Sequence, residues 1–106
     1  MNEIVPLRGR VYRADLGNGY KPWLVVSNNH RNRAIGDVIV VRITTTQREL
    51  KSWVPLSSAD APLVGYVNCD DIGPMFRDDV AADLGALSPE TMVRVREALM
   101  HSLSLT

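Results

Sequence analysis

The longest uninterrupted aliphatic run in this chain has only four residues, Val38 to Val41. It opens a strand-like segment that ends in three threonines at 44–46. Such a run is too short to cross a membrane as a helix. Side chains along a β-strand alternate between two faces, so Ile39, Val41 and Ile43 share one face. Because that face is entirely apolar, we expect it to pack into a core.

The opposite face of the same strand carries Val38, Val40, Arg42 and Thr44. Functional groups concentrate where rigid elements pass into loops, and this strand ends beside Thr44. A guanidinium next to a hydroxyl donor suits a phosphodiester. The threonines also fit a plain strand-end turn without a function, and the motif by itself does not decide between the two interpretations.

The pattern along the chain predicts a series of short strands separated by turns. The expected strands are 11–16, 21–27, 37–44, 52–56, 65–72 and 82–87. The turn Gly17-Asn18-Gly19 joins the first two into a hairpin. Residues 28–36 are expected to form a polar loop or a short helical turn, and residues 77–79 a single helical turn.

A C-terminal helix follows the last strand. Ser88 is its expected cap, Pro89 suits the first helical position, and Glu90 favours the positive end of the helix dipole. Its expected core face consists of Met92, Val95, Leu99 and Leu103. Its expected outward residues are Arg94, Arg96 and Glu97. Short strands closed by one helix predict a small, strongly bent antiparallel barrel.

The chain has 106 residues, of which 45% are hydrophobic. This is enough for one modest core, so we expect a single domain, 1–106. Met1 to Pro6 lack the features of a signal peptide. The single cysteine, Cys69, cannot form an internal disulfide and is expected to be a buried structural thiol. These features predict a cytoplasmic protein without membrane segments.

The formal net charge is zero, but the charges are unevenly distributed along the chain. Residues 1–51 hold nine Lys or Arg and four acids, whereas residues 52–106 hold three Arg and eight acids. Such asymmetry can create a positive groove on a neutral protein. The alternative, that the charges are only solvated surface, remains open at this point.

Five segments, in this order along the chain, resemble the MazF/PemK (Kid) family of toxin endoribonucleases from type II toxin–antitoxin systems, in its actinobacterial form. They are Arg8-Gly9-Arg10-Val11-Tyr12 with Asp15-Leu16, Lys21-Pro22-Trp23-Leu24-Val25-Val26-Ser27-Asn28, Ile43-Thr44-Thr45-Thr46, Val67-Asn68-Cys69-Asp70-Asp71-Ile72, and Leu87-Ser88-Pro89-Glu90. The resemblance covers the chain from about Leu7 to Leu105.

The resemblance implies a β-rich α+β fold: a small SH3-like antiparallel β-barrel with a C-terminal helix, acting as a homodimer. It also implies sequence-selective cleavage of mRNA or tRNA to 2′,3′-cyclic phosphate and 5′-hydroxyl ends, which inhibits translation and growth. A cognate antitoxin would neutralise the toxin. Neither cofactor nor metal is expected, because the sequence has no ligand cluster with metal spacing.

The resemblance also assigns candidate catalytic residues. Thr44 matches the family's strand-end threonine, and Asp70 matches the acid of the fifth strand. Lys21 stands where the family has an arginine before proline. Arg42, on the face of Thr44, is our candidate for restoring the missing guanidinium, although a surface Arg paired with an Asp is equally possible. The short loop after Leu16 contains no acid, so no general base is assigned.

Further residues are candidates for RNA binding: Arg13, Tyr20, Thr45, Thr46, Arg48 and Asn68. Trp23, Trp53 and Tyr66 are able to stack on bases, but strand aromatics in small barrels are more often core or dimer contacts. His30 is a possible proton carrier, although the family has no fixed histidine there.

Two other functions compete with RNA cleavage. One is a toxin of the same fold that inhibits DNA gyrase by binding protein, which relies on an aromatic C-terminal tail, whereas this chain ends in Leu103-Ser104-Leu105-Thr106. The other is a catalytically inactive RNA- or peptide-binding barrel. If the chain is a toxin, an acidic antitoxin segment is expected along Lys21, Arg42 and Arg48.

Overall fold

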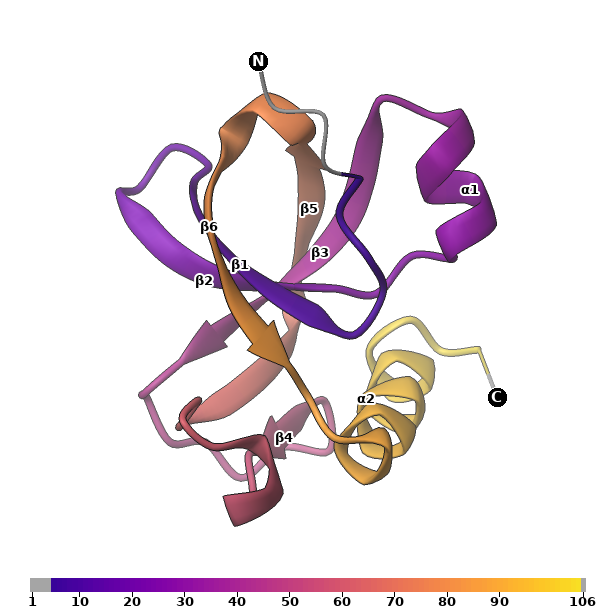
Figure 1. Cartoon of the computed structure of the whole chain (residues 1–106). Coiled ribbons are helices and arrows are strands. Elements are labelled where there is room, and N and C mark those ends of the chain that lie inside the picture. Colours follow the sequence, from indigo (N-terminus) through magenta and orange to yellow (C-terminus); the bar gives the residue numbers. More distant parts are fainter. Residues whose placement is uncertain (1–4, 106) are drawn as a thin grey trace.

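Six antiparallel strands and two helices form the part of the chain, residues 5–105, that this computed structural model describes (Figure 1). In chain order they are β1 (Arg10–Asp15), β2 (Tyr20–Val25), α1 (Asn29–Ala34), β3 (Asp37–Thr44), β4 (Trp53–Pro55), β5 (Tyr66–Phe76), β6 (Val80–Ala86) and α2 (Pro89–Ser102). Two 3-10 turns, η1 (Ser58–Asp60) and η2 (Arg77–Asp79), precede β5 and β6. All six expected strands are present, whereas η1 was not predicted.

The strands form one sheet in the order β4-β5-β3-β2-β1-β6, and neighbouring strands in this order are antiparallel. Figure 1 shows the sheet curling strongly, with α2 against its lower part. This confirms the expected β-rich fold with a C-terminal helix. Within residues 5–105 the ladder runs from β4 to β6 without joining them, so the expected barrel is not closed.

The first hairpin follows the predicted turn. β1 ends at Asp15 and β2 begins at Tyr20. The carboxylate of Asp15 accepts the backbone N–H groups of Gly17 and Gly19, at 2.9 and 3.1 Å. The side chain of the last residue of β1 therefore fixes the short loop, and β2 starts close to the end of β1.

The longest strand, β5, contains a pronounced bulge where it runs beside β3. Val41 pairs with Ile72, but the next residue, Arg42, pairs with Asn68. Residues 69–71 thus have no counterpart on β3. Bulges of this kind bend a strand and redirect its side chains, and β5 continues beyond the predicted end, to Phe76.

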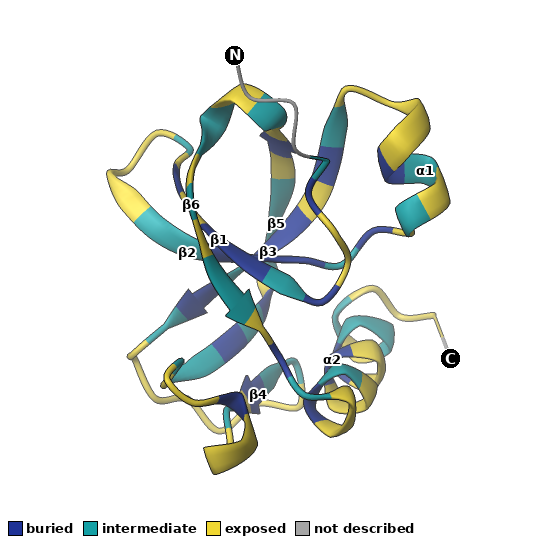
Figure 2. Cartoon of the chain, in the orientation of Figure 1, coloured by how far each residue is buried: buried dark blue, intermediate teal, exposed yellow. Residues whose placement is uncertain are grey.

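Two separate apolar clusters lie on the two faces of the curled sheet, and Figure 2 shows buried residues along the middle strands. The first includes Val41 and Ile43 and packs against α2, and the second includes Val38 and Val40. The prediction that one face of β3 is core throughout was therefore wrong. Ile39 is 37% exposed, because the curl of the sheet covers the opposite side of β3 at that point.

Helix α2 begins as predicted. Ser88 is its N-cap and accepts the backbone N–H of Thr91, with Pro89 at the start of the helix. The buried residues of α2 are Thr91, Val95 and Ala98. Met92 and Leu99 pack beside them, and Arg94, Arg96 and Glu97 are exposed, as expected. Leu103 was wrongly assigned to the core face, because the helix ends before it and leaves it 51% exposed.

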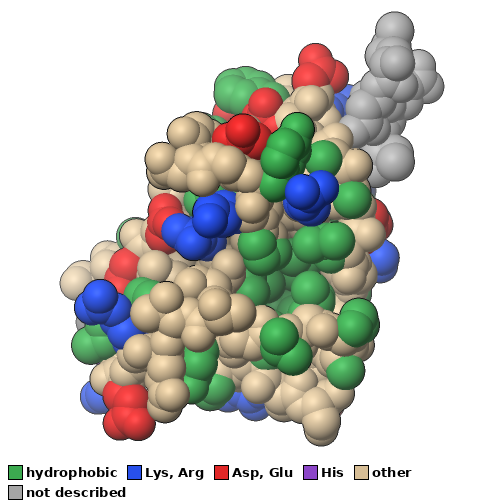
Figure 3. All heavy atoms as spheres, turned by 90° about the vertical axis from the view of Figure 1, so that its left-hand side faces the viewer, with side chains coloured by type: hydrophobic (Ala, Val, Ile, Leu, Met, Phe, Trp, Pro, Cys, Tyr) green, Lys and Arg blue, Asp and Glu red, His purple; other side chains and the backbone are tan. Residues whose placement is uncertain are grey.

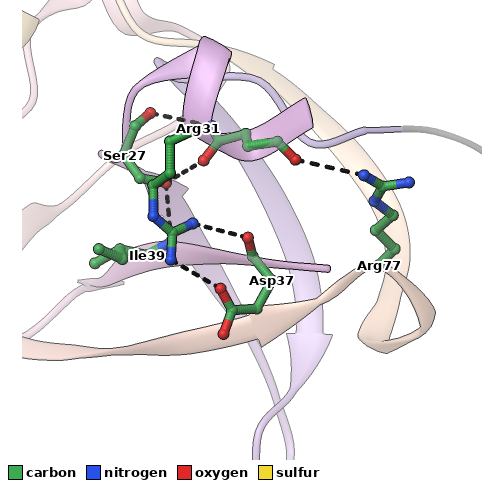
Figure 4. A network of polar contacts seen from close by, with 6 residues as sticks. Ser27, Arg31, Asp37, Ile39 and Arg77 are labelled. Carbon is green, nitrogen blue, oxygen red and sulfur yellow. Dashed lines mark hydrogen bonds and ion pairs between the residues drawn. The ribbon is translucent and has the colours of Figure 1, made fainter. Parts of the chain in front are cut away.

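Helix α1 forms where a loop or helical turn was predicted, and Asn28 caps it by accepting two backbone N–H groups. Figure 4 shows how α1 is attached to β3. Arg31 donates to both the carbonyl and the carboxylate of Asp37, at 2.9 Å each. Ser27 donates to the side chain of buried Asn32 and accepts the N–H of Ile39. These polar contacts fix the start of β3.

Cys69 is fully buried, as predicted, and burial together with the neighbouring Asp70 raises the pKa of its thiol to about 12. A thiol with this pKa is protonated near neutrality and is a poor nucleophile. In residues 5–105 no helix is long and apolar enough to span a membrane.

Asp60 is the most deeply buried acid among the described residues, 1% exposed, and connects η1 to α2. Its carboxylate accepts the N–H and the hydroxyl of Ser57, the N–H of Ser88 at 2.7 Å and the hydroxyl of Thr91 at 2.7 Å. Burial alone would raise the pKa of Asp60, but the N–H groups of Ser88 and Ser57 and the Thr91 hydroxyl lower it to about 2.

We expect Asp60→Ala to lower the free energy of unfolding by about 3 kcal/mol, because buried donors lose a charged acceptor. Asp60→Asn, which keeps one acceptor oxygen, should cost less. Because the folded pKa is lowered, the stabilisation is present above about pH 4 and is lost as the pH falls towards about 2. Denaturant unfolding should therefore show the gap between wild type and Asp60→Ala narrowing over that range. A stability difference between wild type and Asp60→Ala that stays constant over this pH range would show that Asp60 is not ionised in the folded protein.

Candidate functional site

The start of β2 and the end of β3 bring three predicted site residues together. Trp23 pairs with Arg42 in the β2–β3 ladder. Continuing this register by two residues places Lys21 opposite Thr44, with all four side chains on one face of the sheet. The face expected to carry Arg42 beside Thr44 therefore also carries Lys21.

These residues surround a hollow of about 190 Å³, which we call the Thr44 cavity. It is lined by Lys21, Pro22, Arg42, Ile43, Thr44, Thr45 and Val64. Neither Lys21 nor Arg42 forms an ion pair with an acid within residues 5–105. The Nε atom of Arg42 is also buried without a hydrogen-bond partner there. Two cations without ion-pair partners beside a hydroxyl form a site for an anion.

The position of Thr44 is fixed by a close approach of two backbones. Thr44 pairs with Tyr66 in the β3–β5 ladder, and Gly65 lies beside the Thr44 carbonyl. A β-carbon on Gly65 would lie 2.4 Å from that oxygen, and the Gly65 φ angle of +114° disfavours other residues. The Thr44 hydroxyl accepts the N–H of Thr46 at 3.2 Å.

A second hollow, the Arg48 cavity, continues the first, because Arg42 and Thr44 line both. Its volume is about 250 Å³. Its lining residues are Arg42, Thr44, Thr46, Arg48, Trp53 and Asn68. The Arg48 guanidinium lies 5.6 Å from the centre of the Trp53 ring, a distance typical of a cation–π contact. Four predicted RNA-binding residues, Thr45, Thr46, Arg48 and Asn68, thus lie around Thr44.

The face that carries the start of β2 and the end of β3 is shown in Figure 3. Its Lys and Arg side chains are spaced apart, with Asp and Glu side chains and exposed hydrophobic side chains among them. A surface of this kind suits a ligand with alternating charged and apolar groups. Single-stranded nucleic acid, with phosphates and flat bases, has this character.

Asp70 lies away from the Thr44 cavity and does not line it. Its carboxylate accepts hydrogen bonds from Ser52 at 2.7 Å, from the Trp53 indole at 3.2 Å and from Ser102 of α2 at 2.8 Å. The Ser52 and Ser102 hydroxyls, with the Trp53 indole, lower its pKa against the opposing effect of burial. Asp70 therefore connects β5 to the end of α2 and holds Trp53.

Four other candidates, Arg13, Tyr20, His30 and Trp23, lie outside both cavities. The Arg13 guanidinium lies 4.5 Å from the centre of the Tyr20 ring, so these two predicted RNA-binding residues contact each other at the first hairpin. His30 is exposed on α1 and lines neither cavity. Trp23 is buried in the second core cluster, which fits the core interpretation for that residue.

Asp71 was not predicted as a site residue, but the structure shows it lining a further hollow together with Lys21 and Arg42. Simple alternation along β5 places Asp71 on the face of Cys69, which is core. The bulge at 69–71 changes this orientation. The orientation of Asp71 becomes clear only from the pairing of β5 with β3, because no sequence signal reliably predicts a bulge.

Within residues 5–105 no group of three or more His, Cys, Asp or Glu side chains is arranged to hold a metal ion. The polar groups at the site are instead an ammonium, a guanidinium and hydroxyls. Such groups can bind a phosphate, stabilise added negative charge on it, and exchange protons through the lysine.

Comparison with known proteins found a matching protein family. Residues 7–103 match the family described as PemK-like, MazF-like toxin of type II toxin–antitoxin system. The chain is 51% identical over 100 residues to the endoribonuclease MazF1 of Mycobacterium bovis and to the endoribonuclease MazF4 of Mycobacterium tuberculosis. Each alignment covers 94% of both chains.

A solved structure with the same fold comes from a mycobacterial species and is described as an endoribonuclease in complex with its cognate antitoxin. It is 50% identical in sequence and superimposes with a TM-score of 0.92. The match covers 95% of this chain and 97% of the other.

The close approach at Gly65 gives a test of how Thr44 is positioned. We expect Gly65→Ala to lower the free energy of unfolding by about 2–4 kcal/mol, through backbone strain and the clash with the Thr44 carbonyl. Gly36→Ala is the matched control, because a β-carbon on Gly36 would have no neighbouring atom within 4 Å. Thermal unfolding measures both variants. Equal stability of the two would show that Gly65 does not constrain β3.

Proposed function

Because the chain belongs to the family of PemK-like, MazF-like toxins of type II toxin–antitoxin systems, we propose that it is an endoribonuclease toxin that cleaves RNA at the Thr44 cavity. The observation that carries the proposal is the 51% identity to mycobacterial MazF endoribonucleases over 94% of the chain. The joint lining of the cavity by Lys21, Arg42 and Thr44 supports it independently.

The reaction uses a nucleophile that RNA itself supplies. The ribose 2′-oxygen forms a bond to the adjacent phosphorus, and the bond from phosphorus to the 5′-oxygen breaks. One proton leaves the 2′-hydroxyl and another reaches the 5′-oxygen, giving a 2′,3′-cyclic phosphate and a 5′-hydroxyl. The site must therefore stabilise a phosphorane with extra negative charge and assist both proton transfers.

The three residues divide this work. The Thr44 hydroxyl donates a hydrogen bond to a non-bridging phosphate oxygen. Lys21 supplies a compact charge and, unlike an arginine, is able to exchange a proton. Arg42 supplies the planar guanidinium that binds phosphate through two parallel hydrogen bonds. Neither cation forms an ion pair with a described acid, so both are able to contact the substrate phosphate.

The surrounding residues hold the RNA on either side. Arg48 and Trp53 offer a charge and a flat ring next to the reacting phosphate, with Thr46 and Asn68 as hydrogen-bonding groups. Arg13 and Tyr20 extend the contact along the first hairpin. Asp70 acts through Trp53, whose indole N–H it accepts. Its role is to position that ring, while the proton acceptor at the 2′-hydroxyl is a different group.

The proposed partners of this chain are an antitoxin and a second copy of the chain. A solved relative that is 50% identical binds its cognate antitoxin, and we propose an antitoxin for this chain too. An acidic antitoxin segment lying along Lys21, Arg42 and Arg48 would exclude RNA by occupying the same cations. The active form is a homodimer that acts on cytoplasmic RNA and thereby inhibits translation.

The site chemistry predicts cleavage that does not depend on added metal. Purified protein incubated with a mixed RNA pool should cut it equally well with and without EDTA. The new ends should carry 2′,3′-cyclic phosphate and 5′-hydroxyl groups, identified by their resistance or susceptibility to end-specific enzymes. Loss of cutting in EDTA, or 5′-phosphate products, would contradict the mechanism.

The shared role of the cations predicts a pattern of mutational effects. Lys21→Ala, Arg42→Ala and Thr44→Ala should each slow cleavage by about 10²–10³-fold, as removal of an oxyanion-type donor does. The Lys21/Arg42 double variant should lose less than the product of the single effects, because groups acting as a unit are not additive.

Arg33→Ala, which removes an exposed cation from α1, is the matched control and should cut normally. Single-turnover rates on one defined oligonucleotide provide the comparison, with folding checked by circular dichroism. Normal cleavage by Arg42→Ala would show that Lys21 acts without a guanidinium. Normal cleavage by Lys21→Ala would place the cationic group elsewhere.

A further inference from the structure

Another hollow, which we call the Asp71 cavity, adjoins the Thr44 cavity. Lys21 and Arg42 line both, whereas Thr44 lines only the latter. The Asp71 cavity has a volume of about 290 Å³, close to the lower limit for small-molecule sites. Its lining residues are Leu16, Asn18, Gly19, Lys21, Trp23, Arg42, Asp71, Gly73 and Pro74. A group bound here would be a neighbour of the phosphate held by the two cations.

Three residues of this cavity, Trp23, Arg42 and Asp71, carry polar groups without a hydrogen-bond or ion-pair partner within residues 5–105. The Trp23 indole N–H is buried without a hydrogen-bond partner, on a side chain that is only 9% exposed. The Arg42 Nε is buried and unpartnered in the same way. The Asp71 carboxylate shares the cavity with Lys21 and Arg42 but forms no ion pair with either. Buried donors without acceptors are costly and uncommon in native proteins.

The remaining walls of the cavity suit a flat ring. Leu16 and Pro74 offer apolar surface, and Gly73 exposes backbone without a side chain, with nothing within 4 Å of the position a β-carbon would take. Asn18 and Gly19, from the short first hairpin, form the rim. The cavity therefore combines apolar walls with the Asp71 carboxylate as an acceptor and two buried donors without partners, the Trp23 indole N–H and the Arg42 Nε.

We propose that the Asp71 cavity binds the guanine base of a nucleotide next to the cleaved phosphodiester, and that Asp71 thereby makes guanine part of the cleavage sequence. This inference rests on the proposed RNA cleavage at the Thr44 cavity. It assigns a substrate feature, the base beside the cut, to a residue outside the group that acts on the phosphate.

The choice of guanine follows from the hydrogen-bonding groups of the bases. Single-stranded RNA bases are recognised through their Watson–Crick edges. An ionised carboxylate only accepts hydrogen bonds. Guanine offers N1–H and N2–H side by side, which matches the two oxygens of Asp71, and its O6 atom can accept from the Trp23 indole.

The other three bases match the cavity less well. Adenine and cytosine each place a ring-nitrogen acceptor next to their amino group, and this nitrogen would face a carboxylate oxygen. Uracil places its single N–H between two carbonyl groups. Each of them therefore sets an acceptor or a non-polar C–H against Asp71, whereas guanine sets two donors.

The first experiment maps cleavage sites in a randomised RNA pool for wild type, Asp71→Asn and Asp78→Asn. Asp78 is an exposed acid outside all the cavities described, and its replacement removes the same charge. Wild type and Asp78→Asn should require guanine at one fixed position beside the cut. Asp71→Asn should lose that requirement and still produce cyclic-phosphate ends. Wild-type cutting without any guanine preference would overturn the proposal.

The second experiment measures binding without cleavage, using an oligonucleotide whose reacting 2′-hydroxyl is methylated. Guanine at the position found above, or at each flanking position in turn, is compared with inosine, which lacks the 2-amino group. Wild type should bind the inosine oligonucleotide roughly 10- to 100-fold more weakly, and Asp71→Asn should bind both equally. Equal binding by wild type would overturn the proposal.

The two arms separate this inference from the proposed function. If the wild type and Asp78→Asn cut no RNA, the proposed function fails, whereas the binding comparison still tests the base. If Asp71→Asn stops cutting of every RNA but binds guanine with wild-type affinity, Asp71 is a proton acceptor and the base proposal is wrong.

Discussion

The pairing of β3 with β5 is the constraint on which the rest of this structure depends. Each of the two strands contributes to both apolar clusters, so their register determines which side chains are buried and which line cavities. The register breaks once, where Arg42 follows Val41, and residues 69–71 bulge out on β5. On one side of the break lies the Thr44 cavity. Within the bulge, Asp71 lines the Asp71 cavity together with Lys21 and Arg42.

Much of the fold was predictable from local signals. The turn at Gly17-Asn18-Gly19 and the cap at Ser88 depend on neighbouring residues, and both appear as expected, as do the six strands. The features that were missed depend on distant ones. The network of Asp60 joins segments about thirty residues apart, and the burial of Val38 and Val40 requires the curl of the whole sheet.

The candidate site divides in the same way. Arg42 and Thr44 were predicted on one face of a strand because alternation is a local rule, and the resemblance to a family added Lys21. Their common cavity follows from the antiparallel pairing of β2 and β3. The catalytic roles of all four predicted residues stay proposals, and the hydrogen bonds of Asp70 to Ser52, Trp53 and Ser102 set it apart from the other three. No rule of alternation reveals such a separation.

The open sheet leaves β4 and β6 as its two edges. The unpaired backbone N–H and C=O groups of an edge strand can pair with another extended chain, which then adds to the sheet as a further strand. Here β4 has only three residues and ends in Pro55, which lacks an N–H group, and β6 carries the charged Asp83. Register shifts further distort the ladder between β1 and β6. Both edges are thus poor templates for backbone pairing. We therefore expect this protein to recognise its ligands through side-chain surfaces.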